Sequence, residues 1–145
     1  MSAKQKLIFT HPLNRTVKNV LNSHHIHVQR RVEELETVYW SFRLNSCHVW
    51  ISLYWLDSEL CLAANVDLDI YPHSLDRTDV TARSFNFAAL QCSVAKCGAI
   101  TIGFEMPASQ LCDAYARTLL IELIAVPFVF GSGTSFNPTA REKWQ

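Results

Sequence analysis

Three side chains capable of acid–base chemistry come together in the sheet that residues 37–68 are expected to form. Arg43, His48 and Asp67 lie in one cross-strand row of that sheet. A carboxylate beside an imidazole raises the imidazole pKa and can orient the ring for proton transfer. Charge pairing on a solvated sheet face explains the same residues, and no nucleophile is clearly placed in the row. We therefore assign the row to a binding face and assign no catalytic residue.

The remaining histidines and cysteines do not form a recognisable metal site. His24, His25 and His27 could bind a metal only if ligands came from elsewhere in the chain, and no pair of short-spaced ligands of the zinc-ribbon kind is present. Cys92 and Cys97 stand five residues apart, without the two-residue spacing of a redox or zinc pair. We expect an exposed helix end at the histidines, a core position for Cys92, a turn position for Cys97, and neither metal nor cofactor.

An antiparallel meander over residues 37–70 positions the row. Apolar and polar residues alternate from Val38 to Leu44, which is the period of a strand. Two-residue loops at 45–46 and 57–58 then keep one face apolar across three strands, whereas a slip of one residue would destroy this agreement. The predicted pairs are Leu44–Cys47, Phe42–Val49, Trp40–Ile51, Val38–Leu53, Trp55–Leu60, Leu53–Leu62, Ile51–Ala64 and Val49–Val66.

The register divides the tryptophans of this stretch between the two faces. Trp40 and Trp55 fall on the core face, and Trp50 falls on the other. That second face is mixed polar and aromatic, as an antiparallel sheet can present to water or to a partner. Aromatic rings there are typical of interfaces, but a helix of the same chain could also cover them. The candidate binding face comprises Tyr39, Arg43, His48, Trp50, Tyr54 and Asp67.

The segments on either side of the meander predict helices and a hairpin. A short helix begins behind a cap at Asn14, a second helix covers residues 76–89, and a long last helix covers 109–126 and ends before Pro127. Between the last two, residues 90–105 form a hairpin whose loop ends at Gly98. On the first helix we expect Val17, Val20 and Leu21 to face inward. On the last helix we expect an inward stripe and an exposed pair formed by Asp113 and Arg117. The stripe comprises Leu111, Tyr115, Leu119, Leu123 and Val126.

These elements predict an α+β fold with a strongly bent antiparallel sheet. Its order is helix, three-strand antiparallel meander, helix, two-strand hairpin and long C-terminal helix, with the helices packed on the core face. Residues 1–130 form a single domain, and residues 131–145, rich in glycine, serine, proline and charge, form a flexible C-terminal tail.

Composition narrows the class of partner and the cellular compartment. The 13 basic and 13 acidic residues cancel, so no broad positive field attracts nucleic acid. No signal peptide is indicated, because the first residues lack a long apolar stretch. No membrane span is indicated either, because the longest apolar run is broken by Glu122 and Pro127. Five cysteines, mostly inside apolar patterns, fit a reducing cytoplasm.

The order of elements resembles the fold shared by type III secretion chaperones and YbjN-like proteins. The resemblance covers roughly residues 12–130 and rests on the meander at 37–70, the helix at 76–89, the hairpin at 90–105 and the long helix at 109–126. It implies a small cytoplasmic homodimer that holds an extended partner segment or acts as a regulator, without catalytic residues. Secretion chaperones are usually acidic, and the neutral charge of this chain favours the YbjN-like side.

Two functions follow as hypotheses. The first is a non-enzymatic, chaperone-like or regulatory adaptor that acts as a homodimer and binds a peptide or protein, with no nucleic-acid or membrane partner. The second is a small enzyme or ligand-binding domain that uses the face of Arg43, His48 and Asp67. A deep closed pocket around His48 would favour the second, and an open face or groove the first.

Overall fold

The computed structural model describes residues 2–68, 90–94 and 100–130. Its helices are α1 (Ala3–Phe9), α2 (Pro12–Ser23), the 3₁₀ turn η1 (Ala108–Gln110) and α4 (Asp113–Phe130). Its strands are β1 (Arg30–Glu34), β2 (Thr37–Leu44), β3 (Cys47–Leu56), β4 (Glu59–Leu68), β5 (Gln91–Val94) and β6 (Ile100–Pro107). The predicted helix at 76–89, the loop of the second hairpin and the predicted tail at 131–145 lie outside the described residues.

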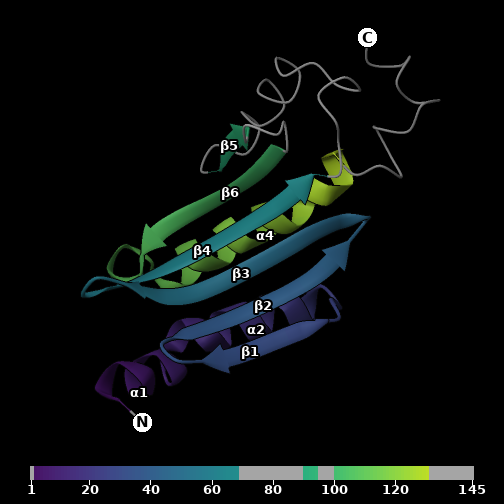
Figure 1. Cartoon of the computed structure of the whole chain (residues 1–145). Coiled ribbons are helices and arrows are strands. Elements are labelled where there is room, and N and C mark those ends of the chain that lie inside the picture. The colour runs from purple at the N-terminus through teal and green to yellow at the C-terminus, as the bar shows by residue number, and fades with distance from the viewer. Residues whose placement is uncertain (1, 69–89, 95–99, 131–145) are drawn as a thin grey trace, which may run out of the picture.

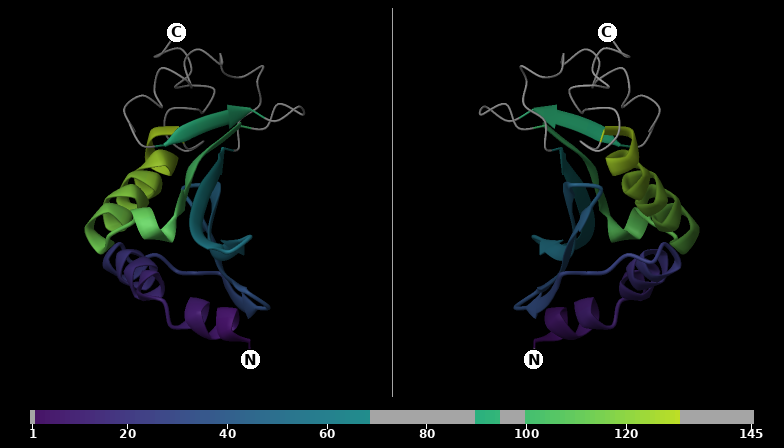
Figure 2. Two further views of the ribbon diagram at one scale, coloured as in Figure 1. Left: turned by 90° about the vertical axis from the view of Figure 1, so that its left-hand side faces the viewer. Right: turned by 90° about the vertical axis from the view of Figure 1, so that its right-hand side faces the viewer.

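A single antiparallel sheet organises the molecule, in the order β1-β2-β3-β4-β6-β5. The described α-helices all lie on one side of it, as the two side views show (Figures 1 and 2). Helix α4 packs on β4 and β6, and α2 packs against α4. The α+β class is thus confirmed, and the described helices lie on the core face as predicted.

The predicted register of the meander is confirmed pair by pair, from Leu44–Cys47 to Val49–Val66. The first loop, Asn45–Ser46, has both residues in the left-handed region, with φ of 49° and 69°, as a type I′ turn requires. In the second hairpin Cys92 pairs with Ile102 and Val94 with Ile100, which is also the predicted register.

The core forms where the apolar strand face meets α2 and α4. Alternate residues of the central strands are buried, and Trp55 packs at the margin, where its indole N–H donates to the Lys4 carbonyl at 3.2 Å. The buried strand positions on the core face are Val38, Trp40, Phe42, Cys47, Val49, Ile51, Leu53, Leu60, Leu62, Ala64, Val66, Leu68, Ile100, Ile102 and Phe104.

Two elements precede the meander without having been predicted. Helix α1 has a capping box in which Ser2 and Gln5 exchange hydrogen bonds, a signal that the sequence carries as S-x-x-Q. Strand β1 pairs with β2 and has Val32 as its only apolar residue, so it lacks the alternation of a core strand. Charged side chains on an edge strand discourage pairing with the strands of other chains.

The start of α2 differs from the prediction. The cap is His11, whose Nδ1 accepts a hydrogen bond from the Leu13 N–H at 3.1 Å, and Pro12 occupies the first helical position. Asn14 lies inside the helix, where its Nδ2 donates to the Ile8 carbonyl at 2.6 Å and ties α1 to α2. The predicted inward positions Val17, Val20 and Leu21 are buried.

The last helix also differs at both ends. It begins at Asp113 after the 3₁₀ turn, and it continues through Pro127 to Phe130. Pro127 is buried, and its carbonyl accepts a hydrogen bond from Asn45 Nδ2 at 2.9 Å, so tertiary contacts support a turn that a proline would otherwise weaken. Tyr115 is 39% exposed and does not belong to the buried stripe, in which Ala116 and Leu120 take its place.

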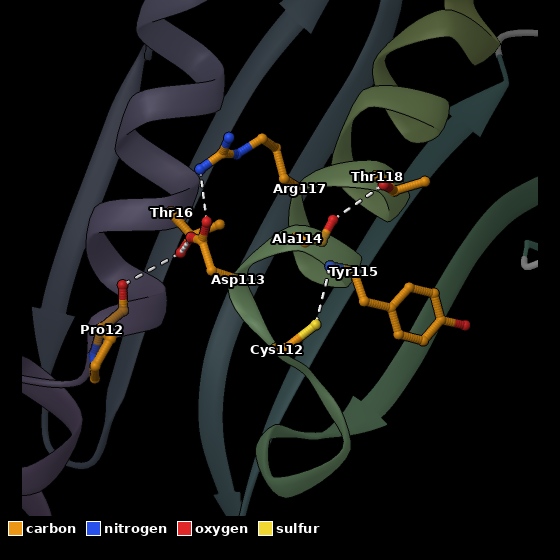
Figure 3. Close-up of polar contacts among 8 residues, drawn as sticks. All are labelled: Pro12, Thr16, Cys112, Asp113, Ala114, Tyr115, Arg117 and Thr118. Carbon is orange, nitrogen blue, oxygen red and sulfur yellow. Dashed lines mark hydrogen bonds and ion pairs between the residues drawn. The ribbon is translucent and has the colours of Figure 1, made fainter.

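A polar contact joins α2 to α4 near their first turns (Figure 3). Asp113 accepts hydrogen bonds from the Thr16 hydroxyl at 2.5 Å and from Arg117 Nη2 at 2.6 Å, and the second of these is the predicted i,i+4 pair. Because Thr16 is 3% exposed, this contact fixes how the two helices meet behind the sheet.

Candidate functional site

The predicted rows of the second sheet face are present. We call this side, which faces away from the described helices, the open face. Its central rows are Arg43–His48–Asp67, Ser41–Trp50–Asn65 and Tyr39–Ser52–Ala63, with Tyr54 beside Thr37 and Cys61. Strand β6 extends these rows with Thr101, Gly103, Glu105 and Pro107.

The histidine and the carboxylate of the acid–base row lie close to each other on an exposed part of the face. His48 Nδ1 lies 3.6 Å from Asp67 Oδ2, and the two side chains are 38% and 46% exposed. Arg43 turns away and donates to the Ser46 carbonyl at 3.0 Å. The nearest hydroxyl in the row belongs to Thr101, which follows Asp67 on the next strand. Because Thr101 is two strands away from His48, the two residues are roughly 10 Å apart. Within this row, therefore, no hydroxyl lies beside the imidazole.

The aromatic residues of the open face lie together on β2 and β3. Tyr39, Trp50 and Tyr54 are each half-buried, in contrast to Trp40 on the core face, which is 3% exposed. No described helix lies on their side of the sheet (Figure 2). The described part of the chain therefore leaves the Trp50 ring in contact with solvent, flanked in its row by the small Ser41 and by Asn65.

A hollow of about 400 Å³ adjoins Tyr39 at the hairpin formed by β1 and β2. It is lined by Val32, Leu35 and Tyr39 together with Arg30, Glu34 and Thr37. Leu35, at the hairpin turn, is 80% exposed with φ of 52°. The aromatic part of the open face thus continues into an apolar depression near the sheet edge.

Glu105 belongs to this face, although the sequence reasoning did not include it. Burial, followed by hydrogen-bonding and charge interactions with Glu105 across β4, raises the pKa of Tyr54 well above its usual value. Beneath them Cys61 and Ala63 are almost fully buried, and burial followed by the charges of Glu59 and Glu105 raises the pKa of the Cys61 thiol. Only the pairing of β4 with β6, which no local pattern specifies, brings Glu105 here.

Gly103 is a second residue of the face that was not singled out from the sequence. It pairs with Asn65, and a Cβ at this position would collide with the Asn65 side chain and the Ala64 carbonyl. The absence of a side chain at Gly103 therefore leaves room for the Asn65 side chain in the Trp50 row.

The histidines at the end of α2 do not form a metal site in the described structure. His24, His25 and His27 are exposed, and His24 Nδ1 lies 3.0 Å from the Val20 carbonyl of its own helix. Across the described residues no group of three histidine, cysteine or acidic side chains could hold a metal ion. Cys92 is half-buried against the core, and Cys97 lies outside the described residues.

The chain also has a groove of about 760 Å³ between α2 and the β1–β2 edge. None of its lining residues belongs to the acid–base row, and it contains Trp40, Leu21 and Val28 with a rim of Arg15, Lys18 and Arg31. Sequence reasoning missed this groove because β1, which forms one side, was not predicted. Separately, none of the helices in the described ranges is long and apolar enough to cross a membrane.

Comparison with known proteins supports the fold. No protein-family model matches the sequence, and the search of curated proteins gave no significant match. A chain in the crystal structure of the ExsC–ExsE complex matches with a TM-score of 0.51 at 17% sequence identity, over 87% of this chain and 91% of that chain. The fold is therefore like that of a type III secretion chaperone, as the order of elements predicted.

Proposed function

We propose that this protein is a non-enzymatic, chaperone-like or regulatory adaptor that binds a segment of another protein on the open face of its sheet. The observation that carries the proposal is the half-buried aromatic cluster of Tyr39, Trp50 and Tyr54 on a face that no described helix covers. Rings of this kind offer large contact area at little cost in conformational entropy and are enriched at protein interfaces.

The structural comparison supports the same class of function. The matching chain comes from a complex of two proteins, so a fold of this kind is compatible with holding a protein partner. The hollow beside Tyr39 gives such a partner a place to insert an apolar side chain at the margin of the face.

The geometry of the acid–base row favours binding over catalysis. His48 and Asp67 are well exposed, and Arg43 is directed to a backbone carbonyl. A catalytic pair is usually placed in a cleft that shifts its pKa values and excludes water. On the open face these charges instead provide polar contacts around the aromatic cluster.

We further propose a cytoplasmic homodimer. Helix α4 has only three charged residues among 18, Asp113, Arg117 and Glu122, and its outward side carries Tyr115 and Ile121, which are 39% and 41% exposed. A surface helix normally presents a charged outer side, and a helix that is apolar all round is normally covered. The outward side of α4 is where we expect a second copy.

Selection of peptides from a random displayed library on the purified full chain tests the binding function. Selected peptides should bind with micromolar affinity or better, and Trp50→Ala should weaken binding by about tenfold or more. Leu7→Ala, which removes a 57% exposed apolar side chain from α1, is the control and should leave the affinity unchanged. If no peptide is enriched, or if both variants bind alike, the open face is not the binding surface.

A further inference from the structure

The groove between α2 and β1 has a cationic rim, and none of its described lining residues is acidic. Its volume is about 760 Å³, with Arg15 and Lys18 on the α2 side and Arg31 on the β1 side. Leu21, Val28 and Trp40 form its apolar part, and the remaining lining residues are asparagines. In a chain whose total charge is zero, this is a local concentration of positive charge.

Two of these cations have no counter-charge within the described residues. Arg117 is paired with Asp113 at 2.6 Å, whereas neither an ion pair nor a hydrogen bond links the side chain of Arg15 or Lys18 to any described residue. They stand three positions apart on α2, where like charges repel. The first turn of the helix contains no acidic residue, so the helix dipole adds to the positive potential.

The third cation is held in place over the apolar part of the groove. Arg31 lies 5.5 Å from the centre of the Trp40 ring and pairs with Glu33 at 2.6 Å. Its position is therefore fixed before any ligand arrives. Leu21 is buried and Val28 half-buried, so an apolar group that enters the groove meets carbon at its base and nitrogen at its rim.

We propose that this groove binds an acidic segment of a partner protein. Carboxylates of the segment meet Arg15 and Lys18, and an apolar side chain meets Val28 and the stem of Arg31. A second copy of this chain is a poor occupant, because a two-fold contact through this surface would bring the same positive charges face to face. The site extends the proposed protein-binding function to a second surface, whose partner is defined by its charge.

The probe is the set of peptides, selected from the random library on the full chain, whose affinity is unchanged by Trp50→Ala and which therefore do not need the open face. They should be enriched in Asp and Glu beside a large apolar residue, and their affinity should fall as NaCl rises from low to physiological concentration. Fluorescence anisotropy should show binding about tenfold weaker for Lys18→Glu and for Arg15→Glu. Lys6→Glu makes the same charge change at an exposed position of α1 outside the groove and should bind like the parent.

Each alternative result has a definite meaning. Selected peptides without acidic enrichment, or equal affinities for Lys18→Glu and Lys6→Glu, overturn the groove proposal. If every selected peptide loses affinity with Trp50→Ala, the groove proposal is overturned and the proposed function stands on the open face alone. Loss of the dimer in Lys18→Glu makes the groove an interface between two copies, and the absence of any selected peptide contradicts both proposals.

Discussion

Trp50 and Trp40 occupy opposite faces of the same sheet and should respond differently to truncation. Trp50 is half-buried on the open face, whereas Trp40 is 3% exposed in the core. We predict that Trp50→Ala costs about 1 kcal/mol or less and that Trp40→Ala costs about 3–5 kcal/mol. Urea unfolding followed by circular dichroism measures both. A cost for Trp50→Ala as large as that for Trp40→Ala would mean that the ring is packed in a second core layer.

His11 makes the start of α2 sensitive to pH. Its Nδ1 accepts from the Leu13 N–H, and burial lowers the pKa of His11 below its usual 6.5. Because the folded chain disfavours protonation, the stabilisation by the cap is present above pH 6.5 and is lost as the pH falls from there through the lower folded pKa. We predict that the free energy of unfolding falls less steeply on acidification in His11→Asn, which caps without titrating. Superimposable pH profiles for variant and parent would contradict this role.

At the scale of elements, the contact of α2 with α4 depends on Thr16. Its hydroxyl donates to Asp113 from a buried position, so Thr16→Val keeps the shape of the side chain and removes the hydrogen bond. We predict a loss of about 1 kcal/mol, since the solvent-exposed Asp113 stays hydrated. Thr118→Val is the control, because its hydroxyl bonds only the Ala114 carbonyl of its own helix, and it should change stability by about 0.5 kcal/mol at most. Equal melting temperatures for the two variants would remove Thr16 as a link between the helices.

The elements also show which parts of the structure could be predicted from local sequence. The meander register was predictable because a slip of one residue would expose the core side chains of β3, such as Val49 and Ile51. Strand β1 and Glu105 were missed, since the first is a charged edge strand and the second joins the face only through pairing of β4 with β6. The end of α4 was misplaced because Pro127 is a local stop signal that burial and the Asn45 contact override.

For the whole molecule we predict a homodimer with α4 at its interface. Light scattering at micromolar concentration should give about twice the chain mass of 16.5 kDa. Ile121→Asp places a charge on the outward side of α4 and should yield a folded monomer, while Leu7→Asp, at a 57% exposed position on α1, should remain dimeric. A parent mass of 16.5 kDa would contradict the dimer, and a dimeric Ile121→Asp would place the interface elsewhere.

Binding of a partner segment to the open face can be mapped by titrating a selected peptide into the ¹⁵N-labelled full chain and recording NMR spectra. We predict that the largest shift changes fall on the indole N–H of Trp50 and on backbone amides around Tyr39 and Tyr54. The indole N–H of Trp55, which donates to the Lys4 carbonyl on the core side, should change least among the described tryptophans. Changes confined to the outward side of α4, with Trp50 unaffected, would contradict binding at the open face.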